Sequence, residues 1–551
     1  MYSRKKNIQQ LVGLLKAHRV SQVVVSPGSR NLPIVQSLAG DGFFTCHTVV
    51  DERSAGFFAI GIAQYRRETV AVCCTSGTAV LNYAPAVAEA FYQQVPLVVI
   101  TADRPASLIG QMTGQTLPQQ GVFGALVKGS FNLPDVVSED DERYCNRLVN
   151  EALLETCHRG HGPVHINVPV SEPLYEYSGD PLPAVRAIRR APLRTVITEE
   201  YGARFLSYKK VMLILGQSAG YNTAGPVMRL TRAHDCVVLA EHLCGASRMG
   251  CVGNFDVMMA GIPRESLPSY APELLITTGG HIVSKLIKQF LIEYPPLEHW
   301  HASPSGKVVD TYQCLTDIIE SDGAGFIDFL AMQTSLAPQE RSYSMLWHSG
   351  SKRLPEPDVE FSDIMAVGAL LKALPKTANL QLANSNAVRL AQLFGVCDRT
   401  RVFSNRGTSG IDGCLSTAMG QAAVSKELTF VVIGDLAFFY DINILWNRPV
   451  PRLRIMLNNN GGGGIFHTLP GLGMSDVTRR HTVVEHASDA KDWAESRGLV
   501  YLPVTNAAEL ESQMPVFTGE SADKPMLMEV FTSAEENAEI LRRYYARPAI
   551  T

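Results

Sequence analysis

Short apolar runs alternate with amphipathic stretches along nearly the whole of this 551-residue chain. The apolar runs are bounded by glycine, proline, serine or asparagine and have the length of buried strands. The stretches between them carry apolar residues at helical spacing, and the first example places Ile8, Leu11, Val12 and Leu15 on one face. A strand–helix alternation of this kind predicts an α/β fold with doubly wound parallel sheets.

The alternation falls into three regions, which predict three domains at residues 1–180, 195–340 and 355–551. A proline-rich stretch separates the first two regions, and a polar stretch separates the last two. The first and last regions are candidates for a shared fold. The predicted strands are SQVVVS, TVAVCCT, PLVVITA and GPVHINVPV in the first region, KVMLILG, CVVLAEH and ELLITTGG in the second, and NLQLAN, LTFVVIGD, LRIMLNN and PMLMEVF in the third.

Composition narrows the class of protein. Hydrophobic residues make up 46% of the chain and charged residues 19%, which is the composition of a globular protein. The net charge of −4 gives no reason to expect nucleic-acid binding, which would need a basic face. The eleven cysteines are scattered without a CxxC pair, which indicates free thiols in a reducing cytosol. Because we find no apolar run long enough to span a membrane, we expect a cytoplasmic protein.

Candidate chemistry lies where two strands of the third region end. Asp435 follows one strand directly, and Asn459 comes 24 positions later, in a run of three asparagines and four glycines at residues 458–464. Ligands of open α/β sheets bind at the carboxyl ends of strands. A carboxylate, an amide oxygen and a loop carbonyl are hard ligands that suit Mg²⁺ bound together with a diphosphate. The alternative is that Asp435 only caps a helix and the glycines only turn the chain.

Four arginines at strand–helix junctions predict a second kind of site, for carboxylates. They are Arg30, Arg104, Arg389 and Arg406. A single loop arginine usually forms a solvated ion pair, whereas four in the two outer regions indicate recognition of several carboxylates by the bidentate guanidinium fork.

These motifs resemble those of the thiamine diphosphate enzymes, whose signature is Gly-Asp-Gly followed after a few tens of residues by Asn-Asn. This chain has Gly434 and Asp435 but Leu436 at the third signature position, a departure typical of one branch. The resemblance implies that Glu52, at the end of a strand and before an apolar helix, is the carboxylate that activates the aminopyrimidine.

Six motifs in order, SPGSRNLP, DERSAGFFAIG, TSGTAV, TADRP, NRGTSGIDG and GDLAFFYD, resemble the branch of 2-succinyl-5-enolpyruvyl-6-hydroxy-3-cyclohexene-1-carboxylate synthases of menaquinone biosynthesis. The resemblance implies thiamine diphosphate with Mg²⁺ or Mn²⁺ as cofactors and a homodimer or homotetramer with the site between subunits. It also implies decarboxylation of 2-oxoglutarate and conjugate addition of the resulting enamine to isochorismate. Both substrates are dianions, which gives the arginines a purpose.

The same resemblance assigns the remaining site residues. The residues expected to face the substrates are Ser29, Arg30, Arg104, Gln115, Lys285, Ser385, Arg389, Arg406, Phe466 and Leu469. The residues expected to hold the cofactor are Glu52, Gly410, Ile411, Gly434, Asp435, Leu436, Asn459 and Gly461. Catalytic roles fall to Glu52, Ser385, Arg389 and Arg406.

Two points stay open at this level. The branch carries a basic pair in the middle domain, and Lys285 matches its first member while Leu286 stands at the second. The metal pattern, an asparagine followed two positions later by a glycine carbonyl, fits either Asn459 with Gly461 or Asn460 with Gly462. We choose the first pair, because the strand fixes where the loop begins.

Other classes of protein compete with this interpretation. A thiamine enzyme of the acetolactate type accepts small keto acids and needs fewer arginines. An inert subunit with the same fold would lack the activating carboxylate, and Glu52 is present. A flavin or nicotinamide oxidoreductase would carry GxGxxG after a strand, and none occurs.

Overall fold

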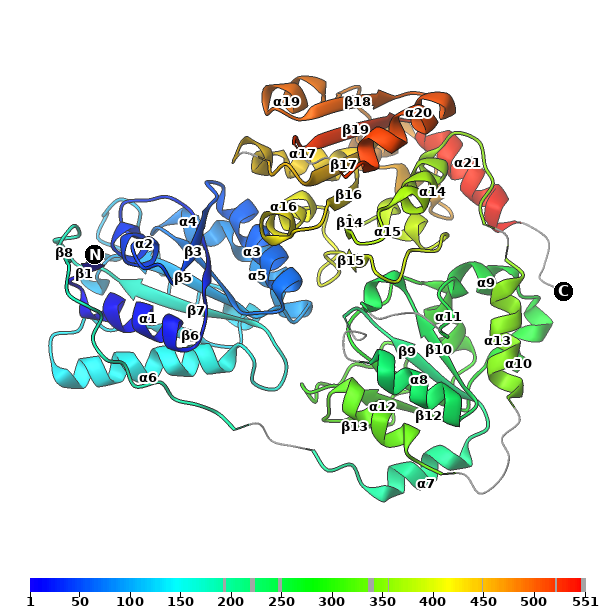
Figure 1. Cartoon of the computed structure of the whole chain (residues 1–551), viewed down its shortest axis with the longest axis horizontal. Helices are drawn as coiled ribbons and strands as arrows, with labels where there is room; N and C mark the ends of the chain where they lie inside the picture. Colours follow the sequence, from blue (N-terminus) through cyan, green and yellow to red (C-terminus); the bar gives the residue numbers. More distant parts are fainter. Residues whose placement is uncertain are drawn as a thin grey trace. The chain divides into compact units, whose positions relative to one another are not determined.

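The computed structural model describes residues 1–191, 195–218, 223–245, 250–334, 341–354, 356–447, 449–520 and 523–546 (Figure 1). The chain divides into two compact units. Unit 1 comprises Met1–Pro192, Asn405–Thr429 and Ala437–Leu453, and unit 2 comprises Leu193–Ser404, Phe430–Leu436 and Arg454–Thr551. The predicted three-domain boundaries stay a prediction.

Unit 1 contains a six-stranded parallel sheet in the order β3-β2-β4-β5-β7-β6. Its strands are β2 (Gln22–Val25), β3 (Thr45–Thr48), β4 (Val70–Cys74), β5 (Leu97–Asp103), β6 (Ser130–Asn132) and β7 (Pro163–Pro169). The main helices of the unit are α1 (Lys6–Ala17), α2 (Leu32–Ala39), α3 (Glu52–Arg66), α4 (Thr78–Asn82), α5 (Ala84–Tyr92), α6 (Glu139–Glu155) and α16 (Cys414–Val424). Two short strands, β1 (Tyr2–Ser3) and β8 (Tyr177–Ser178), pair antiparallel beside it.

Unit 2 contains two sheets. The first is a five-stranded parallel sheet in the order β10-β9-β11-β12-β13. Its strands are β9 (Val211–Leu215), β10 (Cys236–Ala240), β11 (Leu274–Thr278), β12 (Glu298–Ala302) and β13 (Asp317–Ile319). The accompanying helices are α7 (Glu199–Ser207), α8 (Ala224–Ala233), α9 (Phe255–Gly261), α10 (Leu267–Tyr270), α11 (Leu286–Glu293), α12 (Gly323–Ala331) and α13 (Ser342–Lys352).

The second sheet of unit 2 is six-stranded, in the order β15-β14-β16-β17-β19-β18. Its strands are β14 (Asn379–Leu382), β15 (Arg401–Phe403), β16 (Thr429–Gly434), β17 (Leu453–Asn459), β18 (Val500–Val504) and β19 (Met526–Phe531). The helices of this region are α14 (Asp363–Ala373), α15 (Asn386–Ala391), α18 (Asp476–Thr478), α19 (Lys491–Ser496), α20 (Ala507–Thr518) and α21 (Ala534–Tyr545). Helix α17 (Asp435–Tyr440) begins in unit 2 and continues into unit 1.

The first and last sheets have the same topology, as the sequence had suggested. Numbered by their order in the chain, the strands of both sheets run 2-1-3-4-6-5. The strand order therefore reverses between β2 and β4 in the first sheet and between β14 and β16 in the last. In doubly wound sheets such a switch point is where ligands bind, beyond the carboxyl ends of the strands.

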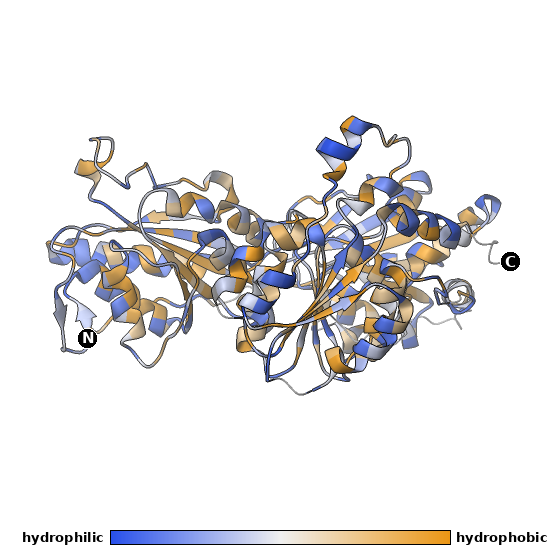
Figure 2. Ribbon diagram, turned by 90° about the horizontal axis from the view of Figure 1, so that it is seen from above, coloured by the Kyte–Doolittle hydropathy of each residue, from blue (hydrophilic) through white to orange (hydrophobic). Residues whose placement is uncertain are grey.

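The hydropathy pattern agrees with this architecture. The strands of the sheets are predominantly hydrophobic in Figure 2, and the predicted strand residues are buried on both faces, as β4 and β9 illustrate. No helix in the described part of the chain is long and apolar enough to cross a membrane. All eleven cysteines are free thiols, as predicted.

Within unit 1, helices α3 and α16 pack at a distance that only glycine permits. A Cβ atom on Gly61 would lie 2.0 Å from the carbonyl oxygen of Thr417, and one on Gly420 would lie 2.0 Å from that of Phe58. Each helix therefore presents a glycine to the backbone of the other. This crossing fixes α3, which begins with Glu52.

Candidate functional site

The site in unit 2 is built around Asp435, the first residue after β16. This residue is only 2% exposed. Oδ2 accepts hydrogen bonds from the backbone N–H groups of Asn460, at 3.1 Å, and Gly462, at 2.9 Å. Oδ1 accepts one from the N–H of Leu436 at 2.6 Å. The carboxylate thus joins the end of β16 to the glycine loop after β17, and burial raises its pKa.

The asparagines of the loop have different partners. Asn459, the predicted metal ligand, donates its Nδ2–H₂ to Glu529 at 2.7 Å and to the carbonyl of Ser488 at 2.9 Å. Asn460 donates its Nδ2–H₂ to Asp363 at 2.9 Å. Its Oδ1 is buried and finds no hydrogen-bond partner among the residues that the structure describes. A buried acceptor of this kind is costly unless a ligand satisfies it.

Asn458, the remaining asparagine of the run, does not fit the metal pattern. Asn458 also leaves its Oδ1 buried without a partner in the described part of the chain. Two positions after Asn458 stands Asn460 and not glycine. The spacing of the metal pattern therefore leaves Asn459 and Asn460 as the alternatives.

The glycines let the loop backbone approach Asp435. Gly461 and Gly462 have φ values of +79° and +150°, which side chains rarely adopt. A Cβ atom on Gly462 would also lie 2.8 Å from the carbonyl of Val483, and one on Gly464 would press on the amide of Asn460 at 2.9 Å. A larger residue at these positions would move the N–H groups that hold the carboxylate.

A cavity of about 650 Å³ lies in the same unit. Three of the predicted substrate residues, Lys285, Arg389 and Leu469, line it. Lys285 precedes α11, Arg389 lies in α15, and Leu469 follows the short turn Gly464–Thr468 that contains Phe466. The structure therefore brings together residues that are distant in sequence, around one space of the size of a small-molecule site.

Arg389 is held by the turn from which its helix starts. Its Nη1 donates to the carbonyl of Ser385 at 2.6 Å, and burial lowers the pKa of the guanidinium. Ser385 itself has φ +73°, a strained value for a residue with a side chain. Strain of this kind persists where the surrounding structure enforces it, often at functional sites.

Sequence reasoning missed the acidic wall of the cavity. Glu241 and Asp256 line it together with Tyr545 of α21. Glu241 is buried, accepts the backbone N–H groups of Val283 and Ser284 at 2.7 Å each, and has its pKa raised to about 7 by burial. Its position directly after the apolar part of the predicted strand CVVLAEH was the available signal.

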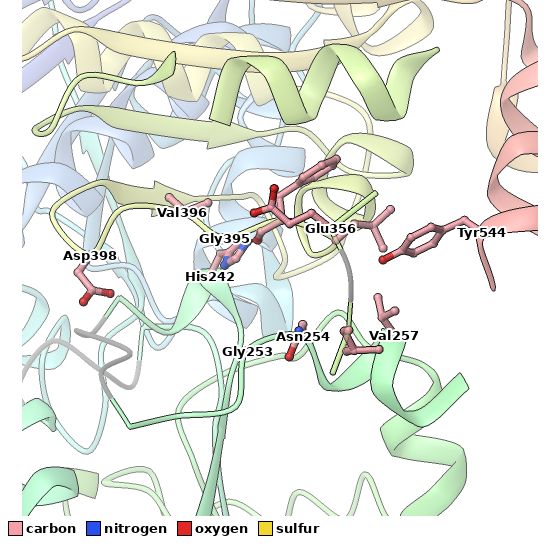
Figure 3. Close-up of a pocket in the computed structure, with 12 residues that line it drawn as sticks. His242, Gly253, Asn254, Val257, Glu356, Gly395, Val396, Asp398 and Tyr544 are labelled. Carbon is pink, nitrogen blue, oxygen red and sulfur yellow. Dashed lines mark hydrogen bonds between the residues drawn. The ribbon is translucent and has the colours of Figure 1, made fainter. Parts of the chain in front are cut away.

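A second cavity of about 300 Å³ shares Gly253 and Leu393 with the first (Figure 3). Its wall includes His242, which lies beside the segment that carries Gly395. The ring nitrogen Nε2 of His242 is 2.8 Å from the carbonyl of Ala391 and 2.9 Å from that of Phe394. The histidine thus braces the end of α15, the helix that carries Arg389.

Unit 1 carries four further predicted substrate residues after its strands. Arg30 is 5% exposed and donates to the carbonyl of Val170 at 2.9 Å, and its other terminal nitrogen lies 3.0 Å from the exposed Glu172. Arg104 follows β5 and donates through Nε to the carbonyl of Gly114 at 3.0 Å. Ser29 and Gln115 are exposed. All four residues lie just after a strand or in the loop that follows it.

The loop that contains Arg406 is anchored by a buried acid that the sequence did not reveal. Glu89 of α5 accepts the N–H groups of Gly407 and Thr408 at 2.7 Å each and the hydroxyl of Thr408 at 2.9 Å. Glu89 is 1% exposed and Arg406 is 8% exposed. Further along the same loop, Gly410 is half-buried and Ile411 is 40% exposed.

Glu52 begins helix α3, after β3. The preceding Asp51 caps the helix by accepting the N–H of Ser54 at 3.1 Å, which leaves the Glu52 side chain free of that task. Glu52 is half-buried, and burial raises the pKa of its carboxyl. A carboxyl with a raised pKa can share a proton with a basic ring nitrogen.

The first comparison with known proteins concerns the class. Residues 6–123 match the family model described as "Thiamine pyrophosphate enzyme, N-terminal TPP binding domain". The parallel α/β sheets, the repeated topology of the outer two and the Asp435 cluster agree with that match. The chain is a thiamine pyrophosphate-dependent enzyme.

Relatives that align over nearly the whole chain identify the family within this class. The protein of Bacteroides thetaiotaomicron named 2-succinyl-5-enolpyruvyl-6-hydroxy-3-cyclohexene-1-carboxylate synthase is 52% identical, with 99% of each chain covered. Proteins with the same name from Phocaeicola vulgatus and Porphyromonas gingivalis are 50% and 36% identical, with 99% of this chain and 99% and 97% of the relatives covered. The chain belongs to the 2-succinyl-5-enolpyruvyl-6-hydroxy-3-cyclohexene-1-carboxylate synthase family.

Proposed function

We propose that the protein catalyses the thiamine diphosphate-dependent decarboxylation of 2-oxoglutarate and the conjugate addition of the remaining four-carbon unit to isochorismate, in menaquinone biosynthesis. The product would be 2-succinyl-5-enolpyruvyl-6-hydroxy-3-cyclohexene-1-carboxylate, which the names of the relatives specify for those proteins. The observation that carries the proposal is the Asp435 cluster with the unsatisfied oxygen of Asn460.

The metal that accompanies the diphosphate, Mg²⁺ or Mn²⁺, would be held by Asp435, Asn460 and the carbonyl of Gly462. This is the second of the two registers that the sequence allows. The Oδ1 of Asn459 already accepts the backbone N–H of Gly461 at 3.3 Å, whereas the Oδ1 of Asn460 is buried without a partner in the described part of the chain. The side-chain oxygens are of the hard type that Mg²⁺ prefers. Gly434 and Leu436 would complete the cradle at the end of β16.

When bound, thiamine diphosphate supplies a thiazolium ring that stabilises negative charge on the carbon where CO₂ is lost. Glu52 would lie beside the aminopyrimidine ring of the cofactor, where its carboxyl would hold and exchange a proton. The raised pKa of its carboxyl suits that exchange, because a proton moves most readily between groups of similar pKa. Gly410 and Ile411 would support the cofactor.

Substrate recognition would rest on the arginines. Arg389 and Lys285 on the wall of the 650 Å³ cavity provide positive charge for carboxylates. Arg30 forms an ion pair with Glu172, whose side chain is exposed. A substrate carboxylate can take the place of the Glu172 carboxylate, because Glu172 can then turn into solvent and leaves no unpaired buried charge. Arg104, Arg406, Ser29, Gln115, Ser385, Phe466 and Leu469 would complete the substrate-facing set.

The larger organisation is also proposed on the family resemblance. We infer three domains at residues 1–180, 195–340 and 355–551, a cytoplasmic location, and a homodimer or homotetramer. Light scattering of the purified protein tests the assembly, and a monomer at micromolar concentration would contradict it.

The direct test is a product assay. The purified protein is incubated with thiamine diphosphate, Mg²⁺, 2-oxoglutarate and isochorismate, and the product is identified by mass spectrometry. CO₂ release from 2-oxoglutarate is compared with release from pyruvate under the same conditions. A preference for pyruvate would overturn the assignment in favour of an enzyme of the acetolactate type.

A further inference from the structure

Asp363, a buried residue at the start of α14, contacts the proposed metal ligand Asn460. It is 1% exposed and lies 97 residues away from Asn460 in the chain. Asp363 belongs to none of the motifs that carried the sequence analysis. We propose that Asp363 is a positioning residue that fixes which atom of the Asn460 amide faces the metal. The inference rests on the proposed metal site.

One hydrogen bond in this network has a direction that the backbone fixes. The backbone N–H of Asp363 donates to Oδ1 of Asn537 at 2.9 Å. A backbone amide can only donate, so the Asn537 side chain must place its oxygen there and its Nδ2–H₂ elsewhere. That Nδ2–H₂ donates to the hydroxyl oxygen of Thr532 at 2.9 Å.

The direction of these bonds also fixes the role of the Asp363 carboxylate. The hydroxyl oxygen of Thr532 already accepts from Asn537, and its proton points to Oδ1 of Asp363 at 2.7 Å. Oδ2 of Asp363 accepts from Nδ2 of Asn460 at 2.9 Å. Both carboxylate oxygens thus accept, and Asn460 is compelled to direct its nitrogen toward Asp363. Its Oδ1 is left for a cation, and this is the atom that has no partner among the described residues.

Substitution by asparagine would reverse this arrangement. In Asp363→Asn the proton of Thr532 still needs an acceptor, so the new side chain would turn its oxygen toward Thr532. Its Nδ2–H₂ would then face Asn460, whose amide must rotate to offer its oxygen to that donor. The nitrogen of Asn460 would face the metal, and an N–H₂ group is no ligand for it. Replacing a residue that orients a metal ligand typically weakens metal binding by ~10–100-fold.

The neighbouring asparagine provides a matched control. Glu529 is a fully buried carboxylate that accepts the Nδ2–H₂ of Asn459 at 2.7 Å, as Asp363 accepts that of Asn460. Glu529→Gln therefore makes the same chemical change beside the other register of the loop. If the metal uses Asn460, only Asp363→Asn should weaken binding.

The measurement is a Mn²⁺ titration of each protein at saturating thiamine diphosphate, with free Mn²⁺ followed by electron paramagnetic resonance. We expect a 10–100-fold weaker Kd for Asp363→Asn and a change of less than about threefold for Glu529→Gln. Circular dichroism and the midpoint of urea denaturation verify that each variant is folded. Equal Kd values for Asp363→Asn and the parent would overturn the inference, as would weakening by Glu529→Gln alone.

An exchange variant keeps the proposal testable if Asp363→Asn does not fold. In Asp363→Asn/Asn460→Asp the new amide donates to the new carboxylate, whose second oxygen remains available to the metal. We expect its Kd to lie within tenfold of the parent, and complete loss of binding by the folded exchange variant would overturn the inference. A parent protein that binds no Mn²⁺ with thiamine diphosphate would instead overturn the proposed metal site itself.

Discussion

The crossing of α3 and α16 permits a sharp prediction for Gly61→Ala. The new Cβ atom would lie 2.0 Å from the carbonyl oxygen and 2.9 Å from the carbonyl carbon of Thr417. Ordinary Cβ contacts begin at 3.4 Å, so the helices must separate by about 1.4 Å at this point. Backbone atoms cannot rotate away as the end of a flexible side chain can.

Two opposing effects decide the outcome. Alanine is favoured over glycine inside a helix by about 1 kcal/mol. Overpacking a close contact typically destabilises by about 1–3 kcal/mol, and more where only backbone can yield. Because the contact here is to backbone, we expect the steric effect to win and Gly61→Ala to be less stable by about 2 kcal/mol.

The displacement of α3 should also lower the catalytic rate. Helix α3 begins with Glu52, so a separation of the helices moves the proposed activating carboxylate. A misplacement of about 1 Å can reduce turnover by about 100-fold. We therefore expect a large fall in kcat for Gly61→Ala, with bound thiamine diphosphate retained.

Two assays and one control test this reasoning. The midpoint of the first urea transition and kcat are measured for the parent, for Gly61→Ala and for Gly42→Ala. Gly42 lies in the same unit with nothing within 4 Å of its added Cβ, so that variant should match the parent. A Gly61→Ala protein with both the midpoint and kcat of the parent would refute the close backbone contact.

Four further predictions concern the site and its surroundings. Glu52→Gln should abolish turnover while calorimetry still detects binding of thiamine diphosphate, and retained activity would remove Glu52 from the mechanism. Arg389→Ala should raise KM for at least one substrate about 10–100-fold through the loss of a charge-assisted hydrogen bond, and unchanged KM values for both would contradict that role. Asp435→Asn should weaken Mn²⁺ binding at least tenfold by the titration described above, and parental affinity would exclude Asp435 as a ligand. Burial raises the pKa of Glu241 from 4.5 to about 7, so the folded state holds a proton that the unfolded state releases in that window. Stability should therefore fall as pH rises from 4.5 to 7, by up to about 3 kcal/mol for this group, and a Glu241→Gln variant whose urea midpoint changes with pH as the parent's does would disprove it.

The sequence by itself determined the fold class and supplied the candidate site residues. Buried parallel strands need long apolar runs, and the runs at residues 210–216 and 428–435 contain β9 and β16 as predicted. A carboxylate at a strand end is a local feature, so Asp435 could be named as a candidate ligand without a structure. The glycines after β17 were equally visible, since positive φ values at Gly461 and Gly462 restrict those positions to glycine.

Only the tertiary structure shows which partners the side chains of the candidate site have. The proposed choice of Asn460 over Asn459 depends on which side-chain oxygen lacks a partner among the described residues. The carboxylates that accept the two amide nitrogens, Glu529 and Asp363, lie 70 and 97 residues away in the chain. Distant groups decide whether a side chain donates or accepts a hydrogen bond. The hydropathy pattern of a strand does not reveal which groups these are. The acid that anchors the Arg406 loop, Glu89, was hidden for the same reason, because its bonds span more than 300 residues.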